Sequence, residues 1–360
     1  MNRRLALIAL QVLLATACTG GQRLPDAVKA PAVVTTLPAT APAITCPAEQ
    51  VEDPSLTPRT YDPLTELPSP NDLPADSTMA TIRKKDGTGK LKVGVSADTL
   101  LFGSRNQQTG QIEGFDIDML KEVAKAIFGV TSDADAYARL EIVVIPYSQR
   151  IPKLKSGDVD IVAHTMTINC VRWQQIAFSE EYYHSSQKLL VNLIGGAPQY
   201  ADLEAFAAAK ATVCVPDGST NKEFITSAAA QALGITYAAT TDGSDDPTDE
   251  VVSPVDISDC LVLLQQGKVD GITGDDTVLA GLSAQDRSTT VVPEGVGFTS
   301  EPYGLGINAD RVDFVQFVNA VLEQMRDDGR WQEIYDHWLL PNLGEGTQPT
   351  PRYGRPEPTS

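Results

Sequence analysis

The order of apolar and polar residues along this chain repeats itself once. Residues 151–162 and residues 261–272 each begin with apolar side chains at helical spacing, pass through Gly157 or Gly267, and end in a short β-branched run. A glycine after an apolar helical stretch is typical of a helix C-cap, and the run that follows predicts a strand. The pattern therefore predicts two copies of one helix, turn and strand unit, with chance similarity between two ordinary junctions as the alternative.

Polar residues follow each of the two predicted strands. They are residues 164–167 after the first strand and residues 273–276 after the second. In open α/β sheets, ligands bind at the carboxyl ends of strands. Two α/β lobes with polar strand ends predict a cleft in which a small polar molecule is held from both sides.

Further elements of the first lobe can be predicted around this unit. Residues 90–96 and 140–145 have the pattern of short strands, and residues 114–129 have an apolar helical face that ends at a glycine. Asp116 is a plausible N-cap of that helix. Tyr147 follows the second strand, where its ring either faces the cleft or packs at its rim.

The start of the chain predicts export. Residues 1–18 have a basic start, an apolar run too short for the roughly 20 residues that span a bilayer, and small residues before Cys18. Cys18 is placed as in the bacterial lipobox, whose Cys is acylated, but Ala15 stands where that motif usually has Leu, so a plain secretory signal is the alternative. The following Pro-, Ala- and Thr-rich segment cannot bury a core and predicts a tether over residues 19–85. The last residues, 343–360, have the same character and are expected to form a flexible tail.

Charge narrows the range of partners. The 360 residues carry a formal net charge of −19, which argues against nucleic acid and anionic membrane surfaces, because both require basic patches. Much of the excess lies in residues 242–256, which are interpreted as a solvated loop.

Four cysteines follow the signal segment: Cys46, Cys170, Cys214 and Cys260. An even number in an exported protein indicates disulfides, and four cysteines allow three pairings. Cys214 with Cys260 is favoured because both fall in the second lobe, which leaves Cys46 with Cys170. No metal site is expected, because the chain has no CxxC pair and its three His are scattered.

Arg172 follows the first polar strand end, at the point where a helix should begin. Helix N-termini and the guanidinium fork both bind carboxylates. A surface salt bridge is the commoner role of an Arg, and the local pattern alone favours that role.

A longer series of motifs changes this interpretation. In order along the chain they are Gly114-Phe115-Asp116-Ile117-Asp118, Arg150-Ile151-Pro152-Lys153-Leu154, Gly157-Asp158-Val159-Asp160, Met166-Thr167-Ile168, Arg172, Phe178-Ser179, Tyr182-Tyr183 and Glu301-Pro302-Tyr303-Gly304. This series, spread over residues 80–342, resembles the polar-amino-acid-binding extracellular receptors of solute-binding protein family 3. The phrases at residues 100–103 and 167–173 are similar to those of actinobacterial glutamine- or glutamate-binding lipoproteins.

The resemblance implies a fold and a domain arrangement. The fold is α/β: a two-lobed periplasmic-binding-protein fold of type II, with a ligand cleft between lobes and two crossing hinge strands. Residues 188–192 and 303–307 are the candidate crossings. The implied boundaries are residues 86–187 with 303–342 for the first lobe and residues 188–302 for the second.

The resemblance also implies the roles of individual residues. Arg172 holds the ligand α-carboxylate, helped by Thr165 and Thr167, while Asp275, with Asp276 as the fallback, takes the α-ammonium. Further contacts with the ligand are implied for four residues: Gly218, Ser219 and Thr220 on its carboxylate, and Tyr147 packed against it.

The chain departs from the family pattern near the first strand. Ser96 stands where an acid is often found, with Asp98 two residues on, and Thr99 stands near the usual position of an aromatic residue. Arg105 could pair with a side-chain carboxylate and favour glutamate or aspartate over glutamine, but a solvent-facing Arg is the commoner case. Arg150 and Lys188 have the same standing.

The implied function is that of a receptor and not of an enzyme, with no cofactor. We expect an extracytoplasmic, lipid-anchored protein that binds L-glutamate, L-glutamine, L-aspartate or L-asparagine by lobe closure and presents it to an ABC permease. A sensor that reports the ligand to a membrane signalling partner is the alternative. An enzyme on the same fold is a more distant one, since Asp275 or His164 could supply an acid or base but no paired catalytic constellation stands out.

Overall fold

The computed structural model describes residues 57–84, 87–232, 251–252 and 254–357. Within these residues, ten strands form one large mixed sheet in the order β10-β9-β11-β7-β13-β6-β1-β5, with β8 and β12 also pairing with β7. A small antiparallel sheet is formed by β2 (Asp98–Thr99), β3 (Gly103–Arg105) and β4 (Ile112–Glu113).

The first lobe is built on one half of the large sheet. Its strands β1 (Leu91–Val95), β5 (Leu140–Val144) and β6 (Ile161–Val162) are parallel to one another. Its helices are α2 (Thr78–Arg83), α3 (Phe115–Phe128), α4 (Asp133–Ala138), the 3-10 turn η1 (Tyr147–Gln149), α5 (Arg150–Ser156), α6 (Cys170–Trp173), α12 (Val312–Asp328), α13 (Arg330–Trp338) and α14 (Leu340–Leu343). The apolar faces of α3 and α12 are buried in its core.

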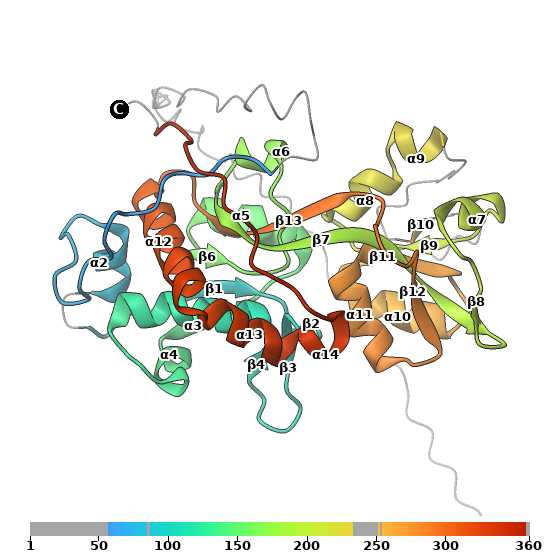
Figure 1. Ribbon diagram of the computed structural model, residues 1–360, viewed down its shortest axis with the longest axis horizontal. Helices are drawn as coiled ribbons and strands as arrows, with labels where there is room; N and C mark the ends of the chain where they lie inside the picture. Colours follow the sequence, from blue (N-terminus) through green and yellow to red (C-terminus); the bar gives the residue numbers. More distant parts are fainter. Residues whose placement is uncertain (1–56, 85–86, 233–250, 253, 358–360) are drawn as a thin grey trace, which may run out of the picture. The chain divides into compact units, whose positions relative to one another are not determined.

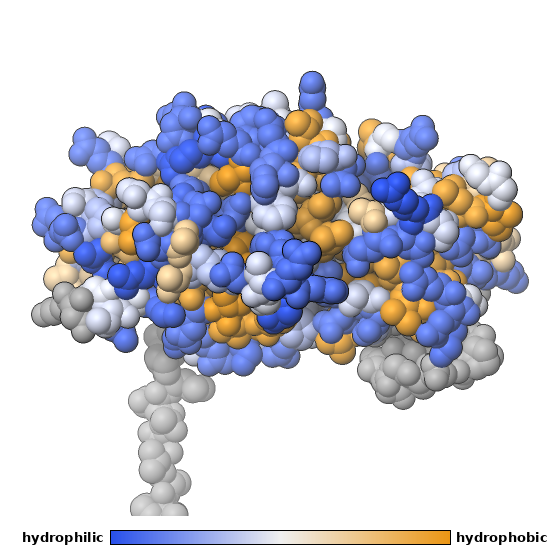
Figure 2. Space-filling view, turned by 90° about the horizontal axis from the view of Figure 1, so that it is seen from below, coloured by the Kyte–Doolittle hydropathy of each residue, from blue (hydrophilic) through white to orange (hydrophobic). Residues whose placement is uncertain are grey.

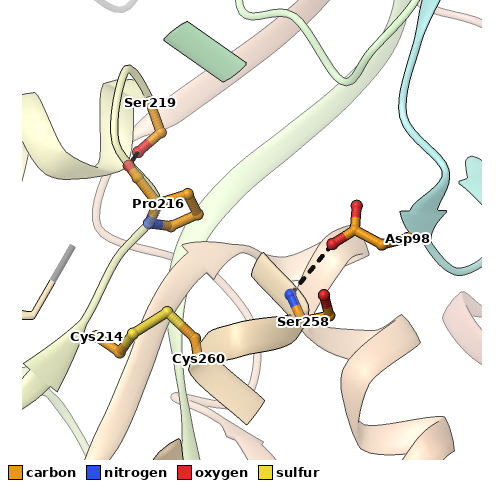
Figure 3. Close-up of a disulfide and its surroundings, with 6 residues drawn as sticks. All are labelled: Asp98, Cys214, Pro216, Ser219, Ser258 and Cys260. Atoms are coloured by element: carbon orange, nitrogen blue, oxygen red, sulfur yellow. Dashed lines mark hydrogen bonds between the residues drawn. A yellow bond between two sulfur atoms is a disulfide. The ribbon is translucent and has the colours of Figure 1, made fainter. Parts of the chain in front are cut away.

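The second lobe is built on the other half of the sheet. Its strands are β8 (Ala197–Pro198), β9 (Val213–Cys214), β10 (Val251–Val252), β11 (Gly271–Asp275) and β12 (Thr289–Val292), and its helices are α7 (Leu203–Ala208), α8 (Thr220–Ile225), α9 (Ala228–Ala232), α10 (Ile257–Gln265) and α11 (Asp276–Gln285). A disulfide joins Cys214 of β9 to Cys260 of α10, the pairing that the sequence analysis favours (Figure 3).

Two long strands connect the lobes, as Figure 1 shows for β7 (Ala177–Ile194) and β13 (Ser300–Ile307). The partner of β7 changes between Ser186, which pairs with β13, and Gln187, which pairs with β11. The expected crossings at residues 188–192 and 303–307 are therefore corrected. The first segment belongs to the second-lobe sheet and the second to the first-lobe sheet, so the chain crosses between them, near residues 186 and 300.

The repeated unit forms as the sequence predicts. Helix α5 ends at Gly157, with φ of 74°, and leads to β6; helix α10 ends just before Gly267, with φ of 67°, and leads to β11. Left-handed φ is easy for glycine, and a Cβ at either position would still be strained. Each helix is thus stopped where a parallel strand must begin, and each strand delivers its carboxyl end to the same region between the lobes.

Part of the expected tether belongs to the folded body. Tyr61 is 2% exposed and packs against Trp173, the Thr60 hydroxyl donates to the Phe178 carbonyl, and Ser77 caps α2. The tether expected over residues 19–85 is therefore wrong for residues 57–84. The remainder of that segment, like the expected signal at residues 1–18 and Cys18, lies outside the described residues.

The C-terminal segment is also folded over the first lobe. Its backbone pairs with the N-terminal segment through the Thr60 N–H to Arg352 carbonyl bond and the Arg355 N–H to Thr60 carbonyl bond. The Arg355 guanidinium lies 3.8 Å from the centre of the Trp173 ring. The expected flexible tail at residues 343–360 is therefore corrected for residues 343–357, which these contacts hold in place. The segment is extended and has no helical or strand periodicity, so its sequence does not predict the contacts.

The surface carries scattered apolar side chains. Figure 2 shows one face, where polar residues surround smaller apolar areas. Exposed large apolar side chains such as Val171, Ile194 and Val296 are distant from one another in sequence. In the part of the chain that the structure describes, no helix has both the length and the apolar character needed to cross a membrane.

Candidate ligand-binding site

A cavity of about 290 Å³ opens beside the segment that follows β6. Its wall comes from the segment after β6, from the start of α8 and from the start of β13, through residues that include Thr167, Thr220 and Glu301. These three elements belong to the first lobe, the second lobe and the crossing strand. The cavity is therefore bounded by both lobes, although Arg172 and the polar residues 273–276 at the end of β11 are not among the residues that line it.

Arg172 supplies a fixed positive charge from the first lobe. Asn169 caps helix α6 by accepting from the Arg172 backbone N–H at 2.9 Å, and the guanidinium donates to the Thr167 carbonyl at 2.8 Å. The side chain is 4% exposed, and this burial lowers the pKa of Arg172, an effect opposed by the charges of Glu223, Glu301 and Asp275. Among the described residues the guanidinium has only this one acceptor, and its remaining N–H groups are suited to bind a carboxylate.

Asp275 supplies the opposite charge from the second lobe. It ends β11, and its carboxylate accepts from the Asn221 amide at 2.6 Å and from the Tyr303 hydroxyl. Burial, and after it the charge of Glu301, raise the pKa of Asp275 to about 7. A bound ammonium would oppose both effects, so the site is chemically suited to a cation at this position.

Asp276, the fallback, has a different environment. Its carboxylate accepts from the hydroxyls of Ser185 and Ser186 on β7, at 2.6 and 3.1 Å. Its side chain is 28% exposed, against 5% for the whole of Asp275. Of the two acids, Asp275 is the one in contact with Tyr303 and with the second-lobe residues next to Thr220.

Thr167 and Thr220 face each other across the lobes. Their hydroxyl oxygens are 3.2 Å apart, and both donate to the same oxygen of Glu301, at 2.7 and 2.8 Å. In the sequence Glu301 stands out only as part of a motif, because nothing in the local pattern indicates that its side chain reaches both lobes.

Arg150 is the most engaged cation of the site, although the sequence gives it little weight. It is 2% exposed and donates to the carbonyls of Tyr147, His164, Thr165 and Gly218, the last at 3.1 Å across the lobes. Burial, and after it the nearby charge of Arg172, lower the pKa of Arg150 to about 9. Its guanidinium is therefore occupied by backbone carbonyls.

The turn at residues 218–220 meets the first lobe closely. Gly218 has φ of 75°, and a Cβ there would lie 2.6 Å from the Ser148 Cα, so only glycine fits. The Ser219 hydroxyl donates to the Pro216 carbonyl and accepts from the Lys222 N–H as the N-cap of α8, as Figure 3 shows in part. Ser219 thus positions Thr220, while its own hydroxyl is used within the turn.

A further contact joins the lobes at the other end of the cleft. The Asp98 carboxylate accepts from the Ser258 backbone N–H at 3.2 Å, at the start of α10 (Figure 3). With the contacts of Gly218 and Thr220, it shows that the lobes are closed on each other in this structure.

Tyr147 packs between the lobes. It is 8% exposed, it belongs to the apolar cluster of the second lobe that contains Leu190 and Ile272, and its ring centre lies 4.6 Å from that of His164. The Thr165 backbone N–H donates to Asp116, which also accepts from the Tyr182 hydroxyl. Asp116 is therefore not the N-cap of α3, which is Gly114; it is a buried carboxylate, and burial raises its pKa to about 6.

Arg105 is not brought to the cleft. It lies exposed in the hairpin of β3 and β4, where its guanidinium donates to the Gly110 carbonyl at 2.8 Å. The hairpin directs it toward its own turn, so the expectation that it pairs with a ligand side chain is corrected. Cys170 is disulfide-bonded, and its expected partner Cys46 lies outside the described residues. Among the described residues, no cluster of His, Cys, Asp or Glu has the arrangement of a metal site.

These features define a class of protein: two α/β lobes, joined by two crossing strands, that close on each other, with a buried cation contributed by one lobe and a buried acid by the other. Residues 91–341 match the model of the bacterial extracellular solute-binding proteins, family 3. The chain belongs to this family, and its fold is the type II periplasmic-binding-protein fold.

Two proteins of similar sequence are named for the amino acids that they bind. The ABC transporter glutamine-binding protein GlnH of Bacillus subtilis is 30% identical over 268 residues, which cover 74% of this chain and 86% of the relative. The glutamate-binding protein GluB of Corynebacterium efficiens is 28% identical over 265 residues, covering 72% and 81% of the two chains. These relatives are amino-acid-binding proteins rather than enzymes.

Solved structures agree with the fold. An ancestral arginine-binding protein bound to glutamine has a TM-score of 0.58 and 28% identity, covering 71% of this chain and 99% of that one. The ancestral amino-acid-binding protein AncCDT-1, described as a precursor of cyclohexadienyl dehydratase, has the same TM-score and 27% identity, covering 73% and 99%.

Proposed function

We propose that this protein is an extracytoplasmic receptor that binds a free polar amino acid of the glutamine and glutamate class in its cleft and presents it to an ABC permease. The observation that carries the proposal is the placement of two opposite charges. Arg172 is buried in the first lobe and Asp275 in the second. An α-amino acid carries a carboxylate and an ammonium on one carbon, and it would complete both sites at once when the lobes close.

The strength of binding expected from this arrangement is that of a transport receptor. Charge-assisted hydrogen bonds contribute roughly 1.5–3 kcal/mol each, and a micromolar dissociation constant corresponds to about −8 kcal/mol. Three or four such bonds, less the cost of association and closure, are enough. Closure then couples binding to a change of surface that a permease can recognise.

Within this class, the cations Arg105, Arg150 and Lys188 are already bonded to groups of the protein. Their engagement favours a ligand with an amide side chain over one with a carboxylate. Arg105 faces Gly110, the Arg150 guanidinium is bonded to carbonyls, and the Lys188 ammonium lies 4.0 Å from the Asp276 carboxylate. Burying a ligand carboxylate without a cation would cost several kcal/mol. We therefore propose glutamine as the preferred ligand over glutamate.

His164 supports the same preference. It is 2% exposed, and its Nε2 lies 3.0 Å from the Ile145 carbonyl, which can only accept, so Nε2 carries the proton. Burial lowers the pKa of His164 to about 3, so the ring is neutral. Its Nδ1 has no hydrogen-bond partner within the residues described, and it is an acceptor. A neutral ring offers no positive charge to a ligand side-chain carboxylate.

Calorimetric titration tests the ligand class. The mature fragment is unfolded and refolded to remove carried ligand and is then titrated with L-glutamine, L-glutamate, L-asparagine and L-aspartate. We expect micromolar or tighter binding of glutamine and at least tenfold weaker binding of glutamate. Equal or tighter binding of glutamate would contradict the amide preference, and no heat with any of the four would contradict the receptor proposal.

Membrane attachment and the partner need separate tests. We propose that Cys18 is acylated and anchors the protein outside the cytoplasmic membrane. Cys18→Ala should release the protein into the medium, and retention at the membrane would count against the anchor. Crosslinking of the ligand-bound protein in cells should capture a permease subunit; capture of a signalling protein instead would favour the sensor alternative.

A further inference from the structure

We infer that Glu301 is a positioning residue of the cleft: its carboxylate latches the two lobes together and fixes the hydroxyls of Thr167 and Thr220 as hydrogen-bond acceptors. This inference rests on the proposed function and deepens it. It assigns a role to a residue that does not itself have to touch the ligand.

The first step is the geometry of the carboxylate. Glu301 is 2% exposed, and one of its oxygens accepts from the Thr167 hydroxyl at 2.7 Å and from the Thr220 hydroxyl at 2.8 Å. Its other oxygen accepts from the Thr299 hydroxyl at 2.5 Å. All three bonds are of the charge-assisted kind, which is about twice as strong as the neutral kind.

The second step concerns the lobes. Glu301 stays with the first lobe, because the neighbouring Pro302 carbonyl accepts from the Ile168 backbone N–H at 2.7 Å and Tyr303 pairs with Thr167. Thr220 begins α8 in the second lobe. The bond from Thr220 to Glu301 therefore crosses the cleft, and it exists only when the lobes are closed.

The third step concerns the polarity of the hydroxyls. A hydroxyl has one hydrogen to donate, and an ionised carboxylate has none to give in return. Since Thr167 and Thr220 both donate to Glu301, each presents only lone pairs to the cleft. With Asp275, they form a group of acceptors, which complements an ammonium. The ligand carboxylate is left to Arg172, so the two threonine side chains change from the carboxylate role implied by the resemblance to the ammonium side of the site.

The test is a double-mutant cycle on glutamine binding. Glu301→Ala and Thr220→Val should each weaken binding roughly tenfold to hundredfold, in line with the loss of a charge-assisted bond. The double variant should bind glutamine no more than about threefold more weakly than whichever single variant has the lower affinity, because both changes remove the same bond. Glu301→Gln, whose amide oxygen can still accept from both hydroxyls, should recover most of the affinity.

A matched control comes from the third hydroxyl. Thr299→Val removes a bond to the same carboxylate from a residue only two positions away in the chain, a contact that does not require the lobes to close, so its effect should stay within about threefold. Fully additive effects of Glu301→Ala and Thr220→Val would overturn the inference, as would a loss with Thr299→Val equal to that with Thr220→Val.

A second readout separates this inference from the proposed function. Spin labels on the two lobes report the distribution of interlobe distances without ligand, and Glu301→Ala should shift it to longer distances. If the wild-type protein bound none of the four amino acids, the proposed function would fail. In that case an unchanged distance distribution in Glu301→Ala would overturn the latch, and a shift would support it.

Discussion

Gly281→Ala, which adds a single methyl group to helix α11, should weaken ligand binding although the methyl group does not touch the ligand. Gly281 faces the first lobe, and an ideal Cβ at this position would lie 2.6 Å from the Leu100 carbonyl oxygen and 3.3 Å from its carbon. Real Cβ contacts are not this short, so Gly281→Ala must push the lobes apart at this point. The open form has no such restriction, because there the contact between the lobes is released.

The magnitude follows from two opposing effects. Overpacking of a close contact costs about 1–3 kcal/mol, which corresponds to roughly 5- to 150-fold weaker binding if the ligand-bound form is the closed one. In contrast, Ala in place of Gly within a helix stabilises the helix by about 1 kcal/mol. Gly281→Ala should therefore lower affinity while the free energy of unfolding without ligand stays the same or rises.

Calorimetric titration with glutamine and thermal unfolding of the same samples measure both effects. Ala284→Gly, at an exposed position of the same helix, is the matched control. It should lower the melting temperature and leave affinity unchanged. Wild-type affinity in Gly281→Ala would refute the reasoning, since it would mean that the ligand-bound form lacks the contact between Gly281 and Leu100.

The remaining predictions concern charge, pH and the disulfide. Arg172→Ala leaves a buried carboxylate unpaired and should weaken binding by about 3–5 kcal/mol in calorimetry; unchanged affinity would remove Arg172 from the site. Because the pKa of Asp275 is about 7 in the ligand-free closed form and an ammonium lowers it, binding below about pH 7 should release a proton, and affinity should rise with pH up to that value. Calorimetry in buffers of different ionisation enthalpy should show this release in the wild type and not in Asp275→Asn; equal release in both would contradict it. Replacing Cys214 and Cys260 by Ala opens a loop with a sequence separation of 46 and should cost about 4 kcal/mol of stability in denaturant unfolding; a loss under 1 kcal/mol would show that the unfolded chain is little constrained.

The sequence predicted those features whose cause is local. Glycine at 157 and 267 stops a helix and starts a strand, and the polar residues expected after the second strand include Asp275, which ends β11. Periodicity and glycine conformation act within a few residues, so they can be recognised in one sequence.

The features that the sequence did not predict depend on contacts between residues that are far apart in the chain. Asp116 has a favourable position for a helix cap, but it is buried because Tyr182 and the Thr165 backbone N–H reach it from other elements. Arg150 became part of the site because carbonyls from both lobes converge on it, which no local pattern reveals.

The folded C-terminal segment was not predicted for another reason. Its composition predicts a flexible tail, but Arg355 stacks on Trp173 and its backbone pairs with Thr60. An extended segment that packs through single side chains has no periodic pattern of apolar residues. A prediction from the sequence alone therefore rests on its composition, which is that of a flexible segment.

The central claim is that two charges, one on each lobe, hold the two charges of an α-amino acid. The most direct measurement is calorimetric titration with glutamine and with its two analogues that each lack one charged group, one without the α-ammonium and one without the α-carboxylate. We predict that both analogues bind at least about a hundredfold more weakly than glutamine, because each leaves the buried charge of Asp275 or of Arg172 without the opposite charge of the ligand. An analogue that binds as tightly as glutamine would contradict the account, and it would identify which of the two charges the site does not use.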